Sequence, residues 1–340
     1  MVRKRILIIC LVVIGFPCFS QDLQFSQFYA SPLYLNPAFA GSSELTRVGV
    51  NFRNQWPGLD RSFISYSAYL DHFIAGKNSG VGIVVNGSRE SLSNLQSMEV
   101  GLLYSYRLRL GQSRYLHFGT QGSFVSRSAN FEEVVFSSQL DIDRGTIDGG
   151  NGTWAPEDGN KRFADFNAGL LYYQDRFWLG ASAHHLTQPN ISYLGNDLNR
   201  LPIKYSLHGG VQFKLPSGFI NDYFNNSRQE RTFSVAFNYK QQGIFNQLDF
   251  GTELYFEPLI LGLWYRGIPT KNMLPNNEAL IAVLGFSLPN GLDMGYSYDY
   301  TLSKLGWRNS GGAHEISMRY SFNFADPAGK SRSVLPSFKY

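Results

Sequence analysis

The sequence predicts an all-β protein, a transmembrane antiparallel β-barrel of about 14 strands of the outer-membrane type. Many segments alternate apolar and polar residues with a period of two, which defines a strand with two different faces. Many of these segments run to about 9–13 residues, enough for a tilted strand to cross a bilayer, whereas strands of soluble sheets peak at about five or six. Charged residues make up 16% of the chain, against about 25% in a typical soluble domain.

Residues 1–20 have the layout of a secretory signal peptide. A basic start over residues 3–5 precedes an apolar run over residues 6–16, and Ser20 offers a small residue for cleavage. The apolar run is too short to span a bilayer as a helix. The alternative is a lipidated Cys18, which the bulky residues before it disfavour.

Removal of the signal peptide changes what the composition implies. It removes both cysteines, Cys10 and Cys18, so the mature chain would hold no disulfide and no cysteine nucleophile or metal ligand. It also removes three basic residues and no acidic one, which leaves 27 basic residues against 26 acidic ones, a net charge of +1. The pI of about 8.9 therefore belongs largely to the leader, and no nucleic-acid partner is expected.

Residues 21–44 lie between the leader and the first strand. Pro32 and Pro37 exclude one continuous helix, and Gly41 permits a tight turn. The segment is too apolar for a free arm in water, so we expect a short plug or lid in the barrel mouth. An arm that binds a partner is the alternative. The apolar side chains are those of Phe25, Phe28, Tyr29, Leu33, Tyr34, Leu35 and Phe39.

The predicted barrel occupies residues 45–324, where fourteen segments have strand character. The even number is expected for a bacterial outer-membrane barrel, whose closure leaves no unpaired backbone edge in hydrocarbon. The segments lie near residues 45–53, 62–70, 80–87, 96–109, 114–126, 162–173, 176–186, 203–215, 231–240, 247–256, 258–266, 279–288, 291–302 and 313–324.

The last predicted strand shows the alternation most clearly, in the sequence HEISMRYSFNF at residues 314–324. Its apolar parity, which includes Ile316 and Met318, is expected to face lipid, and its polar parity is expected to face the lumen. The same argument on other strands gives a set of candidate lumen charges. They are Arg107, Arg109, Lys204, Lys214, Asp293, Asp299, Glu315 and Arg319.

The connections between the predicted strands alternate in length, which suggests an orientation. With the N-terminus in the periplasm, the long connections 127–161 and 187–202 face outside, and most opposite connections are tight turns. The exception is 216–230, expected to be a disordered loop or a docking site for a periplasmic partner. An even strand number then places the C-terminal tail, 325–340, in the periplasm together with the N-terminus.

Two short blocks resemble the N-terminal signature of the PorP/SprF family. They are QFSQFYASPLYLNPAFAGS, which starts at Gln24, and RVGVNFRNQWPGL at residues 47–59. The resemblance is specific across residues 21–60. The family pattern marks Gln24, Phe25, Ser26, Gln27, Tyr29, Leu35, Asn36, Pro37, Gly41, Arg53, Asn54, Gln55, Trp56 and Pro57 as candidate partner-binding or motif residues.

The resemblance implies an outer-membrane component of the type IX secretion system of Bacteroidota. Family members support the export or surface attachment of particular cargo proteins, including gliding adhesins, and associate with periplasmic machinery of that system. The partners it implies are therefore outer-membrane lipid, a secreted surface cargo protein such as an adhesin, and periplasmic type IX secretion components.

Nothing in the sequence predicts an enzyme, a cofactor or a metal site. No GxSxG, HExxH or P-loop pattern is present. His184 and His185 are adjacent and are expected on opposite faces of one strand, while His117, His208 and His314 fall on separate strands as polar lumen residues. The acidic stretch 141–160 lacks the ligand spacing of an EF-hand and is expected to be a solvated outer loop.

Three functions remain open at this stage. The first is a non-enzymatic partner in type IX secretion, which binds cargo or machinery through residues 21–44, the 216–230 connection or the outer loops. The second is an outer-membrane channel for small solutes, in which the lumen charges would set selectivity. The third is a hydrolase embedded in the barrel, which would depend on one of the dispersed histidines.

Overall fold

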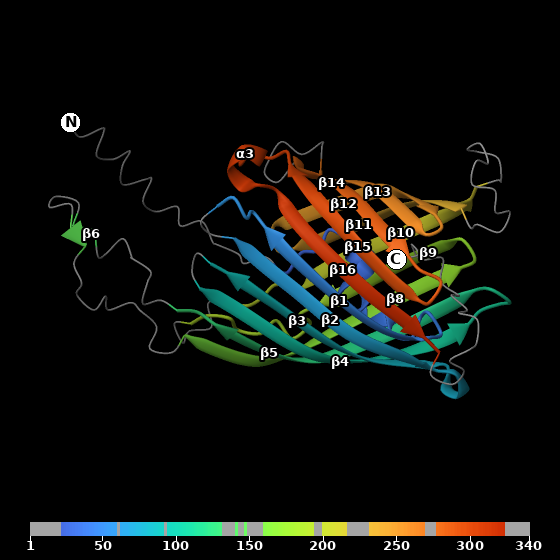
Figure 1. Cartoon of the computed structure of the whole chain (residues 1–340). Helices are drawn as coiled ribbons and strands as arrows, with labels where there is room; N and C mark the ends of the chain where they lie inside the picture. The colour runs from blue at the N-terminus through green and yellow to red at the C-terminus, as the bar shows by residue number, and fades with distance from the viewer. Residues whose placement is uncertain are drawn as a thin grey trace.

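The computed structural model forms a closed antiparallel barrel of fourteen strands, in the order expected when each strand pairs with its neighbour in sequence and β1 closes on β16 (Figure 1). It describes residues 22–59, 62–91, 94–130, 140–141, 146–147, 159–193, 199–215, 231–268 and 277–323. The predicted signal peptide, the 216–230 connection and the tail 325–340 lie outside the described residues, as does most of the acidic stretch 141–160.

Each predicted strand corresponds to an observed one, so the predicted fold class is confirmed. The barrel strands are β1 (Thr46–Gln55), β2 (Phe63–Ile74), β3 (Ser79–Glu90), β4 (Leu95–Arg109), β5 (Tyr115–Ser128), β8 (Asn160–Gln174), β9 (Phe177–His184), β10 (Lys204–Lys214), β11 (Arg231–Gln242), β12 (Phe245–Phe256), β13 (Leu259–Gly267), β14 (Asn277–Ser287), β15 (Leu292–Thr301) and β16 (Ala313–Phe322). A separate hairpin pairs β6 (Leu140–Asp141) with β7 (Thr146–Ile147), and short helices form η3 (Ala75–Lys77) and α3 (Trp307–Ser310).

The alternation of β16 separates an apolar outer wall from a polar interior. Ile316 is 58% exposed on the outside, whereas Glu315 is 0% exposed on the inside. An outer wall of apolar side chains is stable in contact with the hydrocarbon of a bilayer. This contact explains how a chain with so many exposed aromatic side chains avoids aggregation. His314 shares the outward parity of Ile316 and lies beside the rings of Tyr296 and Tyr298, so the expectation that it faces the lumen is wrong.

The barrel has two different ends. We call the end that carries the β1–β2, β3–β4, β5–β8 and β9–β10 connections the loop mouth, and the opposite end the turn mouth. Short connections join β2 to β3, β4 to β5 and β8 to β9 at the turn mouth, and the pair Thr46 and Phe322 also lies there. Among the described residues, no helix is long and apolar enough to cross a bilayer.

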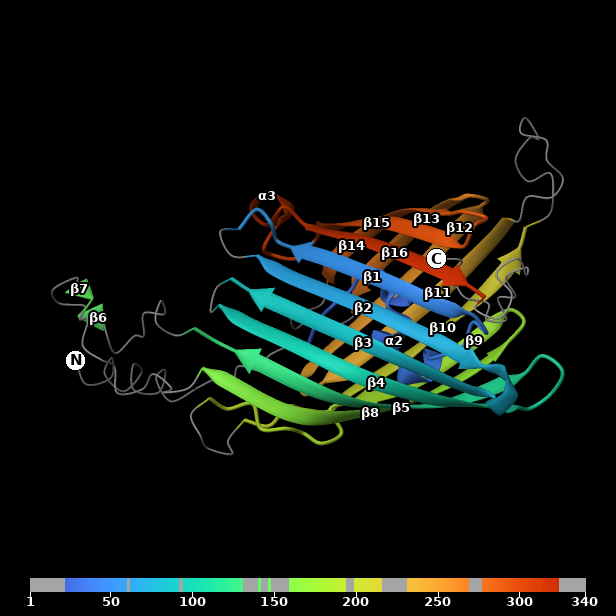
Figure 2. The ribbon, with the colours of Figure 1, turned by 60° about the horizontal axis from the view of Figure 1, so that its bottom comes forward.

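The segment before β1 lies inside the barrel, where Figure 2 shows α2 behind the front strands. Its prolines divide it into η1 (Phe28–Ala30), α2 (Pro32–Leu35) and η2 (Pro37–Phe39), as the two prolines predict. Almost all side chains from Phe25 to Ser43 are buried. They form the apolar core of the molecule together with inward residues of the wall, such as Trp178 and Trp264.

The segment also runs the length of the barrel. Asp22 contacts His185 and Lys204 at the loop mouth, and Gly41 contacts Asp71 near the turn mouth. The described chain therefore begins at one mouth and ends, at Asn323, at the other. The placement of both termini in the periplasm stays a prediction, since residues 1–21 and 324–340 lie outside the described residues.

Candidate functional site

The middle of the N-terminal segment is fixed by Asn36, the asparagine of the Leu-Asn-Pro-Ala motif. Its Oδ1 accepts a hydrogen bond from the backbone N–H of Ala38 at 2.8 Å, which caps η2. Its Nδ2 donates to the backbone carbonyls of Leu170 and Ala181 at 2.9 and 3.2 Å. One buried side chain thus begins a short helix and ties it to β8 and β9, which gives the motif a structural reason.

Two wall glycines make this close approach possible. A Cβ atom at Gly119 of β5 would overlap the backbone of Pro37 and Ala38, and one at Gly169 of β8 would overlap the Asn36 side chain. Any other residue at these two positions would push the segment away from the wall. The glycines of the strands and the proline-rich segment are therefore complementary in shape.

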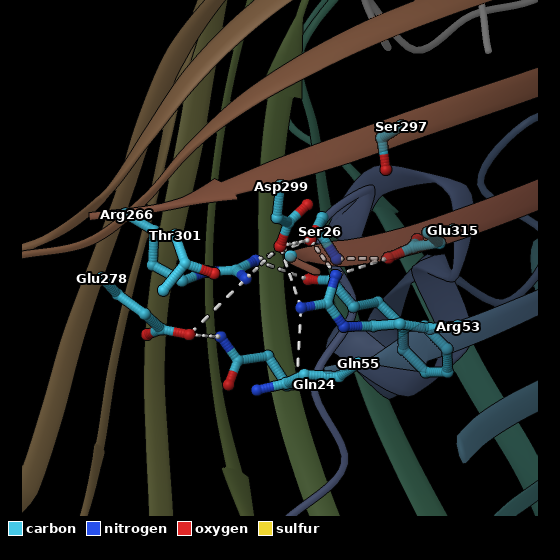
Figure 3. A network of polar contacts seen from close by, with 12 residues as sticks. Gln24, Ser26, Arg53, Gln55, Arg266, Glu278, Ser297, Asp299, Thr301 and Glu315 are labelled. Carbon is cyan, nitrogen blue, oxygen red and sulfur yellow. Dashed lines mark hydrogen bonds and ion pairs between the residues drawn. The ribbon is translucent and has the colours of Figure 1, made fainter. Parts of the chain in front are cut away.

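A buried ion-pair network fixes the start of the segment to the opposite wall (Figure 3). Arg53 of β1 lies 2.9 Å from Asp299 of β15 and 3.6 Å from Glu315 of β16. Arg266 of β13 lies 3.0 Å from the same Asp299 and also pairs with Asp249 of β12 at 2.8 Å.

The segment takes part in this network through Ser26 and Gln27. The Ser26 hydroxyl donates to Asp299 at 2.7 Å and accepts from Arg53 and Arg266. The backbone N–H groups of Ser26 and Gln27 donate to the two oxygens of the Glu315 carboxylate, at 2.6 and 3.1 Å. Buried charges cost several kcal/mol each unless they are paired and hydrogen-bonded, and the segment supplies hydrogen bonds that Asp299 and Glu315 need in addition to their ion pairs.

A second anchor lies near the turn mouth. The Arg47 guanidinium binds both oxygens of Asp71, at 2.8 and 2.9 Å, and donates to the carbonyl of Phe39 at 2.9 Å. The N–H of Gly41, whose φ of +67° suits glycine, donates to Asp71 at 2.7 Å. A planar guanidinium can make such a bidentate contact and a lysine cannot.

A third anchor lies at the loop mouth. The Asp22 carboxylate lies 2.7 Å from Nε2 of His185 and 2.8 Å from Nζ of Lys204, and Nδ1 of His185 lies 2.6 Å from Asp165. Burial alone would lower the pKa of His185, but the carboxylates of Asp22 and Asp165 outweigh it and raise that pKa to about 9. The same contacts, against the effect of burial, hold the pKa of Asp22 well below its usual range.

His185 corrects one sequence expectation. His184 ends β9, and His185 follows it with a φ of +61°. This left-handed backbone turns the His185 ring back inward, so the two rings lie 6.4 Å apart instead of on opposite faces. Side chains alternate between the two faces only while the backbone stays extended. Because β9 ends at His184, this rule does not apply to His185.

Beside the third anchor lies a cavity of about 650 Å³, which we call the vestibule. Its floor is made by residues 22–24 and Tyr34 of the N-terminal segment, and its walls by the loop-mouth ends of β1 to β5 and β8 to β10. The walls mix aromatic residues such as Trp56 and Phe63 with acidic residues such as Glu90 and Glu99. Its volume lies within the range of small-ligand sites, about 300–1,000 Å³.

Most predicted motif residues belong to the N-terminal segment or contact it. Phe25, Ser26, Gln27, Tyr29, Leu35, Asn36, Pro37 and Gly41 are buried within the segment, and Arg53 is buried opposite it. Gln24 and Gln55 lie at the edge of the network in Figure 3 and line the vestibule. Trp56 packs edge-on against Phe63 at 5.4 Å, while Asn54 follows the outward parity of β1 and Pro57 is exposed in the turn after it.

The predicted lumen charges divide into two groups. Arg107, Lys204, Asp293, Asp299, Glu315 and Arg319 point inward and are paired: Arg107 with Glu44, Lys204 with Asp22, and Arg319 with Asp293 at 2.7 Å. Arg109 and Lys214 are exposed at the turn-mouth ends of their strands, and Arg109 donates to backbone carbonyls of its own turn. These two do not belong to the interior charges.

Sequence reasoning missed several residues that hold the segment. They are Asp22, Arg47, Asp71, Asp165, Asp249 and Arg266. Arg47 and Asp71 could have been predicted, because they occupy inward-facing positions of β1 and β2. These two strands alternate apolar and polar residues as clearly as β16 does. Nothing local marks Asp22, because its partners lie more than 160 positions away.

The histidines of the barrel have structural partners. His117 contacts the Tyr173 hydroxyl at 3.1 Å, His208 contacts Nδ2 of Asn36 at 3.2 Å, and His184 contacts the carbonyl of Leu35 at 3.3 Å. Within the described residues, no group of three or more histidine, cysteine, aspartate or glutamate side chains is arranged to hold a metal ion.

The fold and interior define an outer-membrane β-barrel whose lumen is occupied by its own N-terminal segment. Residues 18–320 match the family described as type IX secretion system membrane protein PorP/SprF, and the chain belongs to that family. It is thus an outer-membrane component of the type IX secretion system, as the two sequence blocks predict.

Solved structures show the same class of fold at low sequence identity. A crystal structure of the toluene transporter TodX of Pseudomonas putida is 13% identical, with a TM-score of 0.52, and the match covers 85% of this chain and 93% of that one. A second TodX crystal structure is 12% identical, with a TM-score of 0.50, over 90% and 99% of the two chains. At these identities the likeness concerns the fold alone. No curated protein matches the sequence.

Proposed function

We propose that this protein is a non-enzymatic partner in type IX secretion, which supports the export or surface attachment of particular secreted cargo, such as a gliding adhesin. It acts by binding cargo, periplasmic components of the system, or both. The observation that supports this most directly is the filled interior: residues 25–43 are packed against the wall and held by buried charges near both mouths. A barrel filled in this way is suited to act through the surfaces of its mouths.

The proposal includes an orientation. The loop mouth faces the cell exterior and the turn mouth faces the periplasm, since outer-membrane barrels carry their longer connections outside. The vestibule then lies on the side from which a cargo protein on the cell surface would be reached. The connection 216–230 and the tail 325–340 would be available to periplasmic components.

The test is crosslinking in intact cells, with a photoreactive residue placed at the exposed loop-mouth position Pro57 or at the exposed turn-mouth position Gln112. We expect secreted cargo to be recovered with the first and periplasmic components with the second. A matched control carries the photoreactive residue at Leu102, which is 67% exposed on the lipid-facing wall. Recovery of the barrel alone from both mouths, while a control complex crosslinks efficiently, would contradict the proposal.

The second candidate is a channel for small solutes, which the vestibule and the likeness of the fold to TodX favour. Conductance measured in planar bilayers distinguishes the secretion partner from the solute channel. We expect the full chain to conduct little and a variant that lacks residues 22–43 to conduct well, because the lumen charges would then line an open pore. Steady conductance by the full chain would instead support the channel.

A further inference from the structure

Among the residues that the structure describes, no cation lies within 4 Å of the Glu99 carboxylate of the vestibule. Glu99 points inward from β4 and lines the cavity. In the described part of the chain its only polar partners are two amides: Nδ2 of Asn86 donates to Oε2 at 3.1 Å, and Nε2 of Gln121 donates to Oε1 at 2.9 Å. The acids of the ion-pair network and of the second and third anchors, by contrast, each have an arginine, lysine or histidine within 4 Å.

The two amides are themselves held in place. The Ser67 hydroxyl donates to Oδ1 of Asn86 at 2.8 Å, which leaves Nδ2 of Asn86 directed at Glu99. Nε2 of Gln121 donates also to the Ser123 hydroxyl at 2.8 Å. Asn86 and Gln121 are 1% and 2% exposed, so the carboxylate is oriented by rigid, buried neighbours, as in a preformed binding site.

A second acceptor at the same wall is unused. Oε1 of Gln121 is buried and has no hydrogen-bond donor among the described residues. Leaving a buried acceptor unpaired costs about 1–3 kcal/mol. The Glu99 carboxylate keeps lone pairs beyond the two that the amides use, and the group that satisfies its charge and these lone pairs is a cation with several N–H bonds.

Two of the cations that line the vestibule are engaged elsewhere. Lys204 and His185 pair with Asp22. Arg127 pairs in register with Ser97, two positions closer to the rim than Glu99, and no ion pair joins it to Glu99 in the described residues. The vestibule thus presents an oriented acidic point opposite Val125 of β5, whose partner in register on β8 is Phe163, and an alkyl chain can pack against these apolar side chains of the same cavity.

We propose that the vestibule is a binding site for a primary alkylammonium group, held by the Glu99 carboxylate, with its alkyl chain against the apolar side chains of the neighbouring wall. Such a group is supplied by the lysine side chain of a peptide or by a free amine. The site stands on its own geometry, and it rests on the proposed function only for identifying the lysine with one on a cargo protein.

The test is ligand-observed NMR titration of the purified full chain in detergent micelles. The probes are acetyl-Gly-Lys-Gly-amide, the same peptide with norleucine in place of lysine, and n-butylammonium. We expect the lysine peptide to bind and the norleucine peptide to bind at least about 10-fold more weakly, since a charge-assisted hydrogen bond contributes about 1.5–3 kcal/mol. Comparable binding by butylammonium would identify free amines as a source, and binding by the peptide alone would identify a peptide.

The matched variants are Glu99→Gln and Glu90→Gln, which remove the same charge from two positions of one cavity. Glu99→Gln should weaken lysine-peptide binding about 10-fold and Glu90→Gln less than about twofold. Folding of each variant is checked by its mobility on unheated gels. Equal affinity of the unsubstituted chain and Glu99→Gln, or of the two peptides, would overturn the proposal. Because this readout needs no cargo, it can succeed or fail independently of the crosslinking result.

Discussion

The carboxylate of Asp22 lies 2.7 Å from Nε2 of His185, a contact that joins the first described residue of the chain to the end of β9 at the loop mouth. Asn323, the last described residue, lies at the turn mouth, next to the paired residues Thr46 and Phe322. The N-terminal segment therefore passes through the whole interior before β1 begins. Its removal or displacement would have to break contacts at both ends and in the middle.

The contact predicts that stability depends on pH between about 6.5 and 9. His185 has a pKa raised from 6.5 to about 9 in the folded state, so its pairing with Asp22 and Asp165 stabilises the protein fully below pH 6.5. This contribution is lost as the pH rises through 9, because the imidazole then becomes neutral next to two carboxylates and Lys204. We expect the urea midpoint of the full chain to fall over that range.

The control for this prediction is His185→Gln, which keeps a polar side chain and removes the titrating group. Its urea midpoint should be lower at pH 6 by the equivalent of roughly 1–3 kcal/mol and should lack this step between pH 6.5 and 9. An unchanged step in the variant would show that another group causes it.

The central network predicts a large loss of stability on removal of one arginine. Arg53→Met leaves Asp299 and Glu315 with one fewer cation in a site where Arg53 is 2% exposed. Breaking a buried pair in this way typically costs about 3–5 kcal/mol. Arg109→Met, at an exposed position, should cost less than about 0.5 kcal/mol. Urea unfolding monitored by tryptophan fluorescence measures both, and equal costs would contradict the role given to the network.

The close approach at Gly119 predicts that a methyl group there displaces the segment. Gly119→Ala would place its Cβ against the backbone of Ala38, and overpacking of this kind typically costs about 1–3 kcal/mol. We expect faster proteolysis within residues 25–43 and a higher single-channel conductance. Gly76→Ala is the control, because nothing lies within 4 Å of the added Cβ. A variant indistinguishable from that control would mean that the segment is not held by this contact.

The proposed orientation can be checked with cysteines, since both natural cysteines, Cys10 and Cys18, lie within the predicted signal peptide. Pro57→Cys at the loop mouth should react with a membrane-impermeant maleimide on intact cells. Gln112→Cys at the turn mouth should react only after the outer membrane is opened. The reverse pattern would invert the barrel, and labelling of both in intact cells would indicate a damaged membrane.

Much of the wall was predictable because strand formation is local. The alternation from Ile316 to Tyr320 specified both the strand and the face that meets lipid, and β16 shows that assignment. The prolines at 32 and 37 likewise broke the segment where the sequence indicated. The prediction failed at His185, where the backbone leaves the extended conformation, and at His314, which was assigned to the lumen for its polarity although it shares the parity of Ile316.

The sequence alone determined the barrel, its strand number and the family, because periodicity, strand length and two contiguous motifs are all written in neighbouring residues. Only the tertiary structure decided what the motif residues do. Ser26 meets Asp299 and Glu315 across more than 270 positions, and Asn36 meets Gly169 across more than 130. Such contacts depend on how the closed sheet brings distant strands together around the segment, which no local pattern records. The same holds for the vestibule, where Glu99 differs from the other inward acids only in what surrounds it.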